Sequence, residues 1–308
     1  MSERNLRVLV SRAAKAIPKR ALAECAIGIL LFCVASILGM TYVAVWGEDG
    51  EFYQREYGPA VMLASGHGFV NPISSTVPGL EDFLSTKTSF LDAAGIPSIV
   101  GTQPLTQLQT RWLYQLHCAG MLWSFFGISW KALLPMYGVF FGLNSVAVYA
   151  LFRLVMGLIP SLVGTAAVTL SPFNLYYLPF LRDYSKAPFI LFSIAILGYL
   201  VKCDLRWRSR FALAAALGVL LGVGLGFRKD VVICVPAGIL TLALLIPGNP
   251  WHEKWKRLGA IGLLMTGFLA AGWPMLRGMQ EKGGTTSHVL ILGLKEPFDE
   301  ALGIGNVP

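Results

Sequence analysis

The chain has 308 residues, of which 55% are hydrophobic and 14% are charged, with a mean hydropathy of +0.62. A soluble globular domain carries about 25% charged residues because its surface faces water. The composition therefore excludes a soluble globular domain. The net formal charge of +8 is gathered in short clusters between long uncharged runs. Since a spanning helix needs about 20 predominantly apolar residues, we expect an all-α integral membrane protein.

The uncharged runs predict about seven transmembrane helices. They cover Cys25–Trp46, Ala132–Phe152, Leu154–Leu181, Ala187–Val201, Phe211–Phe227, Val231–Trp251 and Leu258–Leu276. The predicted domains are a cytoplasmic basic tail over residues 1–24, a transmembrane module over residues 25–276, and the start of an outer-face segment over residues 277–308. A large first outer loop, residues 47–131, lies within the transmembrane module and is expected to contain juxtamembrane helices.

An eighth run, Trp112–Trp130, allows two interpretations. Its approach, Gln103–Gln115, is rich in Gln and carries Arg111. We interpret the run as an amphipathic helix at the membrane surface. If it crossed the membrane, every later loop would change sides and the basic loop Lys202–Arg210 would face outward. Because basic residues in short loops favour the cytoplasm, we prefer the surface helix.

Basic residues predict the orientation of the whole chain. The tail before the first span contains six of them: Arg4, Arg7, Arg12, Lys15, Lys19 and Arg20. By the positive-inside rule, the N-terminus is cytoplasmic. We therefore expect a multi-pass protein of the cell membrane (the inner or plasma membrane). Its basic character indicates topology and contact with anionic lipids, not nucleic-acid binding.

Three charged segments fall on the outer face in this topology. They are Glu48–Glu51, Arg182–Lys186 and Arg228–Asp230. Charged residues at a membrane boundary are normally paired or mark a site. Arg and Lys can hold a phosphate, and a carboxylate close by can deprotonate an acceptor hydroxyl. These residue types suit transfer from a lipid-phosphate donor.

Simpler explanations of these segments stay open at this stage. Basic residues at helix ends commonly anchor a helix at the membrane interface. Asp183 and Asp230 can neutralise the bases beside them. Glu48, Asp49 and Glu51 can begin a solvated loop, or their hard oxygen ligands can bind a divalent cation such as Mg²⁺ or Mn²⁺. We assign no metal.

A glycine-rich run lies within the predicted span Phe211–Phe227. It contains Gly218, Gly222, Gly224 and Gly226. Small residues four apart in a span are typical of close helix packing. The run follows no strand and lacks a lysine, so it does not predict a phosphate-binding loop.

The order of several motifs resembles that of the C-type membrane glycosyltransferases, which have the GT-C fold. The segments Trp46–Tyr53 and Ala64–Pro72 resemble the first outer loop of the branch that includes dolichyl-phosphate-mannose protein mannosyltransferases and bacterial aminoarabinose transferases. Further similar segments follow in the same order: Gly127–Ser129, Tyr149–Gly157, Leu170–Asn174 and Leu181–Tyr184. Members of that family are usually longer. From the resemblance we therefore expect either a C-terminally truncated relative or a minimal seven-span module.

The resemblance implies a polyprenyl-phosphate sugar donor and an inverting transfer on the outer face. The family's catalytic carboxylate lies in the acidic pair, where Asp49 is the matching position and Glu48 is a substitute. Asp183 ranks second, because it lies near an outer-loop acid that some relatives use. Four basic residues would bind the donor phosphate: Arg182, Lys186, Arg228 and Lys229.

The sequence therefore predicts a membrane glycosyltransferase whose partners are a polyprenyl-phosphate sugar, the lipid bilayer and a lipid, glycan or protein acceptor. Two other classes remain. A transporter of lipid-linked sugars would also gather basic residues at a membrane face, but it should carry polar residues deep in several spans. A non-catalytic membrane assembly subunit, or a truncated relative, would be inactive and indifferent to replacement of Asp49.

Overall fold

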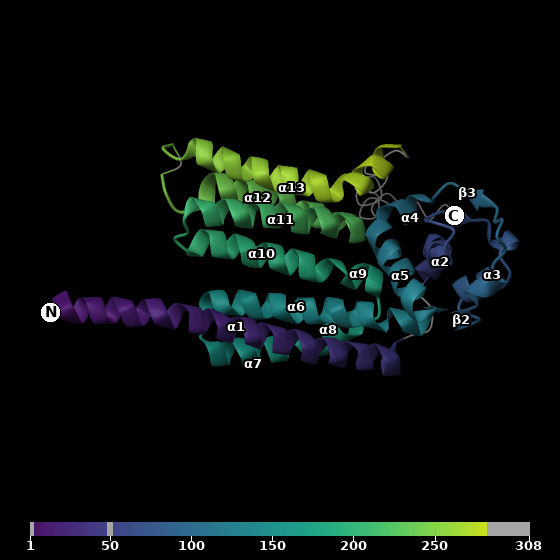
Figure 1. Cartoon of the computed structure of the whole chain (residues 1–308), viewed down its shortest axis with the longest axis horizontal. Helices are drawn as coiled ribbons and strands as arrows, with labels where there is room; N and C mark the ends of the chain where they lie inside the picture. The colour runs from purple at the N-terminus through teal and green to yellow at the C-terminus, as the bar shows by residue number, and fades with distance from the viewer. Residues whose placement is uncertain (1–2, 48–51, 250, 282–308) are drawn as a thin grey trace, which may run out of the picture.

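The computed structural model describes residues 3–47, 52–249 and 251–281, and these are mostly helical (Figure 1). Long helices run side by side in a bundle, and a smaller unit of short helices and strands lies at one end of it. We call residues 52–133 the outer-loop unit. The bundle consists of α1 (Glu3–Trp46), α6 (Leu134–Val155), α7 (Leu158–Thr169), α8 (Pro172–Tyr177), α9 (Leu181–Tyr184), α10 (Lys186–Lys202), α11 (Trp207–Phe227), α12 (Cys234–Leu240) and α13 (Lys254–Glu281).

Five helices in the described part of the chain are long and apolar enough to cross a membrane. They are Ala21–Trp46, Trp130–Val155, Leu181–Lys202, Trp207–Phe227 and Lys254–Gly278. This agrees with an all-α membrane protein, although about seven spans were expected from the sequence.

The two remaining predicted spans are made of shorter pieces. Leu154–Leu181 is divided between α7 and α8, because the Ser171 hydroxyl accepts a hydrogen bond from the backbone N–H of Asn174 and starts a new helix at Pro172. Val231–Trp251 is occupied by the end of a 3₁₀ turn, α12 and a π-helical segment, Thr241–Leu245.

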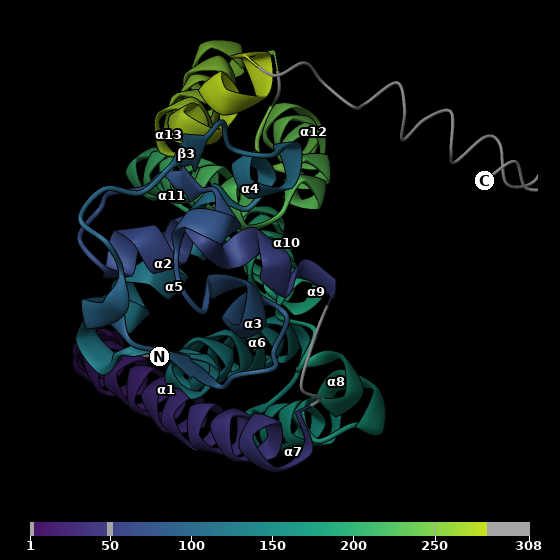
Figure 2. The same cartoon turned by 90° about the vertical axis from the view of Figure 1, so that its right-hand side faces the viewer.

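The bundle has two sides when viewed from the outer-loop unit (Figure 2). Helices α1, α6, α7 and α8 lie on one side, and α10, α11, α12 and α13 lie on the other. The connection between α10 and α11 and the start of α13 are at the end remote from the outer-loop unit (Figure 1). Helix α9 and the end of α11 are at the near end.

Helices α11 and α13 pack tightly against each other, and the glycine run explains this close packing. A Cβ atom at Gly218 would collide with the carbonyl oxygen of Leu264, and one at Gly222 would lie 2.6 Å from the carbonyl oxygen of Phe268. A Cβ at Gly226 would collide with the ring of Tyr114. The prediction that these glycines serve close packing is therefore confirmed.

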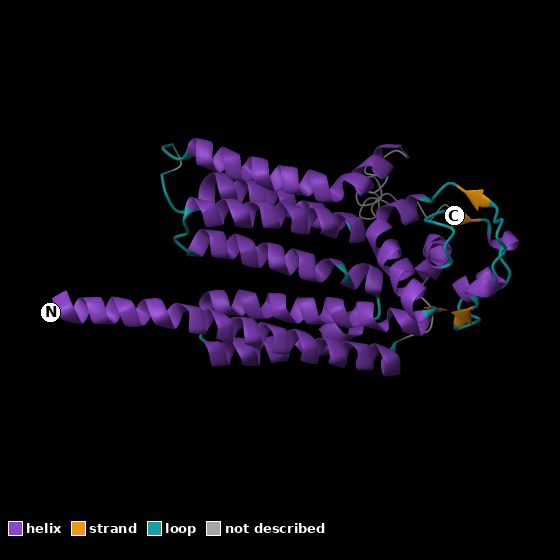
Figure 3. Cartoon of the chain, viewed as in Figure 1, coloured by secondary structure: helices purple, strands orange, loops and turns teal. Residues whose placement is uncertain are grey.

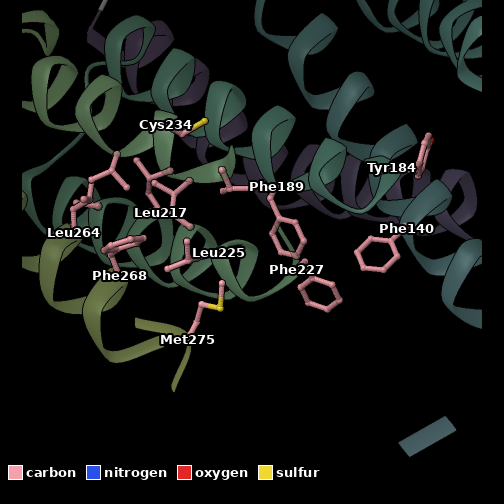
Figure 4. Packing of buried hydrophobic residues seen from close by; sticks show 14 of the residues in the cluster. Phe140, Tyr184, Phe189, Leu217, Leu225, Phe227, Cys234, Leu264, Phe268 and Met275 are labelled. Carbon is pink, nitrogen blue, oxygen red and sulfur yellow. The ribbon is translucent and has the colours of Figure 1, made fainter. Parts of the chain in front are cut away.

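Aromatic and aliphatic side chains pack among α10, α11, α12 and α13, and Phe140 of α6 joins them (Figure 4). Phe189 of α10 stacks on Phe227 of α11 with ring centroids 5.4 Å apart, and Phe140 of α6 meets Phe227 edge-on at 5.2 Å. These rings lie next to the end of α11, so they fix the direction in which the chain leaves that helix toward Arg228.

The outer-loop unit has its own hydrophobic core around Phe83, Trp123 and Trp130. It contains a 3₁₀ turn (Phe52–Tyr57), α2 (Gly58–Ala64), α3 (Leu80–Leu84), α4 (Gln107–Arg111) and α5 (Leu113–Phe126). Two antiparallel strand pairs close it: β1 (Asn71–Pro72) with β3 (Thr102–Gln103), and β2 (Phe90–Leu91) with β4 (Ile128–Ser129). These are the orange strands of Figure 3.

Helix α5 covers most of the run for which the sequence left two interpretations. It is 14 residues long and is not among the five long apolar helices. At about 1.5 Å per residue it is shorter than the hydrocarbon core of a bilayer. It lies at the end of the bundle beside α2 (Figure 1), which is the place expected of a surface helix.

Candidate functional site

Charged side chains gather where α9 and the end of α11 meet the outer-loop unit. Arg182 and Arg228 both donate to the carboxylate of Asp183, with nitrogen–oxygen distances of 3.1 Å and 2.8 Å. Arg228 binds Oδ1, whereas Arg182 is nearest to Oδ2 and donates more weakly to Oδ1, at 3.4 Å. Asp183 therefore joins residues that are 46 positions apart in the sequence.

A second carboxylate extends the same chain of ion pairs. Asp230 accepts from the Nε of Arg228 at 3.1 Å and from Lys186 at 3.4 Å. Arg228 thus lies between two carboxylates, and its side chain is only 18% exposed. Because its planar guanidinium can donate in several directions at once, an arginine suits this bridging position better than a lysine.

The outer-loop unit covers Arg182 with aromatic rings. The guanidinium carbon lies 3.7 Å from the ring centre of Tyr53 and 5.6 Å from that of Trp112. The Nε atom of Arg182 is buried and has no hydrogen-bond partner in the described structure. Cation–π contacts offset part of the cost of burying this charge. An unpaired buried donor of this kind calls for an explanation, such as a water or an ion.

A cavity of about 140 Å³ opens beside these groups. It is lined by Arg182, Arg228 and Lys229 from the bundle and by Leu108, Arg111 and Trp112 from the outer-loop unit. The volume holds several water-sized groups. Four of the six lining residues are basic, so the cavity is suited to an anion with several oxygen atoms, such as a phosphate.

We call Arg111, Arg182, Lys186, Arg228 and Lys229 the basic cluster. Asp183 and Asp230 are the carboxylates paired with it, so these seven side chains carry a net formal charge of +3. The pKa of Lys229 is lowered, first by burial and next by the charge of Arg111. A bound anion would offset this repulsion and favour the charged form of Lys229.

The pKa of Asp230 is also lowered, for a different reason. Burial alone would raise it, but the hydrogen bond from Arg228 and the charges of Arg228 and Lys186 outweigh burial. Asp230 is therefore held in its charged form. This matches the counter-ion explanation that the sequence left open for it.

Polar residues inside the bundle hold α9 in place beneath the cluster. The hydroxyl group of Tyr184 donates to Oδ1 of Asn174 at 3.1 Å, and the amide of Asn174 donates to the carbonyl oxygen of Thr169 at 3.0 Å. Asn144 of α6 also approaches Asn174, at 3.4 Å. These bonds tie the break between α7 and α8 to α9, so they position Arg182 and Asp183.

The structure brings together the four residues predicted to bind phosphate and one of the three predicted catalytic carboxylates. Arg182, Arg228 and Lys229 line one cavity, Lys186 joins through Asp230, and Asp183 links the arginines. The other two predicted carboxylates, Glu48 and Asp49, lie outside the described residues. Tyr53, in the turn that follows them, contacts Arg182 directly.

Arg111, Tyr53 and Trp112 belong to the site but were not predicted from the sequence. In the sequence, Arg111 is only a charge on the amphipathic approach to Trp112–Trp130. The signal that could have found it is its place on a polar segment of the outer loop, next to an aromatic residue at a membrane boundary. No group of three or more His, Cys, Asp or Glu side chains among the described residues could hold a metal ion.

No family model matches the chain, and no match is found among curated proteins or among solved structures. The chemistry of the basic cluster therefore has to be read from its own residues.

Proposed function

We propose that this protein is a membrane glycosyltransferase that moves a sugar from a polyprenyl-phosphate donor to an acceptor hydroxyl on the outer face, with inversion of configuration. The observation that carries the proposal is the cavity lined by Arg111, Arg182, Arg228 and Lys229 at a bundle end. A polyprenyl tail cannot leave the bilayer, so the phosphate attached to it must be bound at the membrane boundary. The resemblance to the C-type family adds the polyprenyl-phosphate sugar donor and the inverting transfer on the outer face.

The proposal includes seven passes through a cell (inner or plasma) membrane. Helix α6 ends far from the outer-loop unit and α10 begins near it, so the chain returns along the bundle through α7 and α8 (Figure 1). In the same way, α12 and the π-helical segment return it from the end of α11 to the start of α13. These two broken segments supply two further passes, which together with the five long helices make seven. The N-terminal basic tail supports an outer location for the outer-loop unit, because basic residues favour the cytoplasmic side.

The catalytic base in this proposal is Asp49. A carboxylate takes the proton of the acceptor hydroxyl, whose oxygen then forms a bond to the anomeric carbon of the sugar. The bond between that carbon and the phosphate oxygen breaks, and polyprenyl phosphate leaves with the electron pair. Arg182 and its basic neighbours bind the charge that develops on the leaving phosphate. Glu48 is the substitute base.

The role proposed for Asp49 is supported by its neighbour Tyr53. The ring of Tyr53 lies against the guanidinium group of Arg182, and Asp49 precedes Tyr53 by only four residues in the sequence. Asp183 is less well suited to deprotonate an acceptor, because both of its oxygens accept hydrogen bonds from arginines.

The test is turnover of the purified protein in lipid with radiolabelled polyprenyl-phosphate sugars. The native chain should consume donor, and Asp49→Asn should abolish consumption while the protein stays folded. Asp183→Asn should retain turnover with a raised KM for the donor, because it disturbs the arginines and leaves the base in place. Retained turnover in Asp49→Asn would reject the assignment. Donor movement across the membrane without transfer would indicate a transporter, and inactivity across donors an assembly subunit.

A further inference from the structure

Two residues of like charge, one from the outer-loop unit and one from the bundle, line the same cavity. Arg111 is the last residue of α4, and Lys229 follows α11. Both line the 140 Å³ cavity, and the charge of Arg111 contributes to the lowered pKa of Lys229. Repulsion between them opposes the docking of α4 on the bundle.

Other contacts hold the outer-loop unit in place nearby. The hydroxyl group of Tyr114 in α5 donates to the carbonyl oxygen of Ala271 in α13 at 2.5 Å. Thr110 of α4 packs against Gly278 of α13, where an added Cβ would lie 2.6 Å from its methyl group. The end of α4 is thus close to the bundle, and the cavity beside it brings cations of both units within reach of one ligand.

We propose that an oxyanion of the phosphate type, bound between Arg111 and the basic residues Arg182, Arg228 and Lys229, clamps the outer-loop unit to the bundle. The anion would accept hydrogen bonds from both units and convert a repulsive contact into two attractive ones. Arg182 lines the cavity, and its buried Nε has no hydrogen-bond partner in the described structure. Arg111 is then a binding residue of the site as well as a part of the outer loop.

This inference rests on the proposed function, since it takes the cavity as the phosphate site, but it can be tested without any transfer. Hydrogen–deuterium exchange of the full chain is measured in maltoside micelles, which contain no phosphate. Peptides covering α4 and α5 are followed alone, with inorganic phosphate and with dodecyl phosphate. Slower exchange of these peptides with a probe is the expected result.

The two probes separate the sources of the anion. Protection by both probes indicates that the phosphate group is sufficient, and protection by dodecyl phosphate alone indicates a lipid-borne anion. If neither probe slows the exchange of these peptides, the clamp is overturned. If the clamp is present and no donor is ever consumed, the inference stands and the glycosyltransferase proposal fails.

Three substitutions sharpen the test. Arg111→Gln should weaken the binding of the protecting probe roughly tenfold, which is the loss of one charge-assisted contact. Arg55→Gln is the matched control, because Arg55 belongs to the same unit, is exposed and does not line this cavity. An equal loss in both variants would show a general charge effect and reject the site.

Arg111→Glu guards against simple misfolding. It replaces the repulsion with an attraction to Lys229, so α4 and α5 should be protected without any anion and should gain little from the probe. The clamp would be contradicted if Arg111→Glu behaved like the native chain. Its α4 and α5 peptides would then exchange fast without a probe and more slowly with phosphate.

Discussion

Lys229 differs from the three arginines that share its cavity because its ammonium group can lose its proton in the alkaline range. A guanidinium stays charged at every accessible pH. The pKa of Lys229 is lowered by burial and by Arg111. A lysine with a lowered pKa becomes neutral at a lower pH than an ordinary lysine does. The affinity of the cavity for an anion should therefore fall as Lys229 loses its charge.

We therefore predict that dodecyl phosphate binds less tightly as the pH rises through the lowered pKa of Lys229. The window begins at about pH 7, where a phosphomonoester with a second pKa near 6 is already a dianion. Lys229→Arg should remove the alkaline decline, because the replacement remains charged. Binding is measured by calorimetry in maltoside micelles across the window. If the affinity of Lys229→Arg declines with pH in the same way as that of the native chain, another group causes the decline.

At the scale of single elements, α11 owes its packing to two glycines that face α13. We predict that Gly218→Ala lowers the stability of the bundle by about 1–3 kcal/mol, the usual effect of overpacking. The reason is the backbone of Leu264, which occupies the space that the new methyl group needs. Thermal unfolding in detergent, followed by circular dichroism, measures the change.

Gly262 provides the control within the same pair of helices. It lies in α13, and nothing is within 4 Å of a Cβ built on it. Gly262→Ala should be neutral or stabilising by up to about 1 kcal/mol, since alanine favours the helix more than glycine does. Equal destabilisation by both substitutions would mean that helix packing is not the cause.

The helices were largely predictable, because a run of apolar residues directly encodes a segment that must lie in lipid. The close packing of Gly218 and Gly222 was predictable for a similar reason, since their spacing places them on one face. The break inside Leu154–Leu181 was missed because hydropathy does not change at Pro172. Its signal was present nonetheless, as a serine before a proline marks a helix start.

The site was predictable only on the bundle side. Arg182 and Arg228 lie at helix ends, where the order of spans assigns them to one face. Arg111, Tyr53 and Trp112 belong to a loop whose fold depends on its own aromatic core. Contacts between residues so far apart in the sequence, such as Tyr53 with Arg182, follow from tertiary packing and from no local pattern.

At the scale of the whole molecule, the two ends of the bundle should face different compartments. The outer-loop unit and the basic cluster are at one end, and the connection between α10 and α11 is at the other (Figure 1). With seven passes and a cytoplasmic tail, Lys131 lies outside and Arg206 inside. If α7 and α8 turned back without crossing, Arg206 would lie outside with Lys131.

Cysteine labelling in intact cells decides between these arrangements. Both Lys131 and Arg206 are exposed, so each can be replaced by cysteine in a chain whose five native cysteines are changed to alanine. A membrane-impermeant maleimide should label Lys131→Cys in intact cells and Arg206→Cys only after the cells are opened. Labelling of both in intact cells would reject the seven-pass arrangement. The reverse pattern would put the basic cluster on the cytoplasmic side, where an outer-face transfer could not occur.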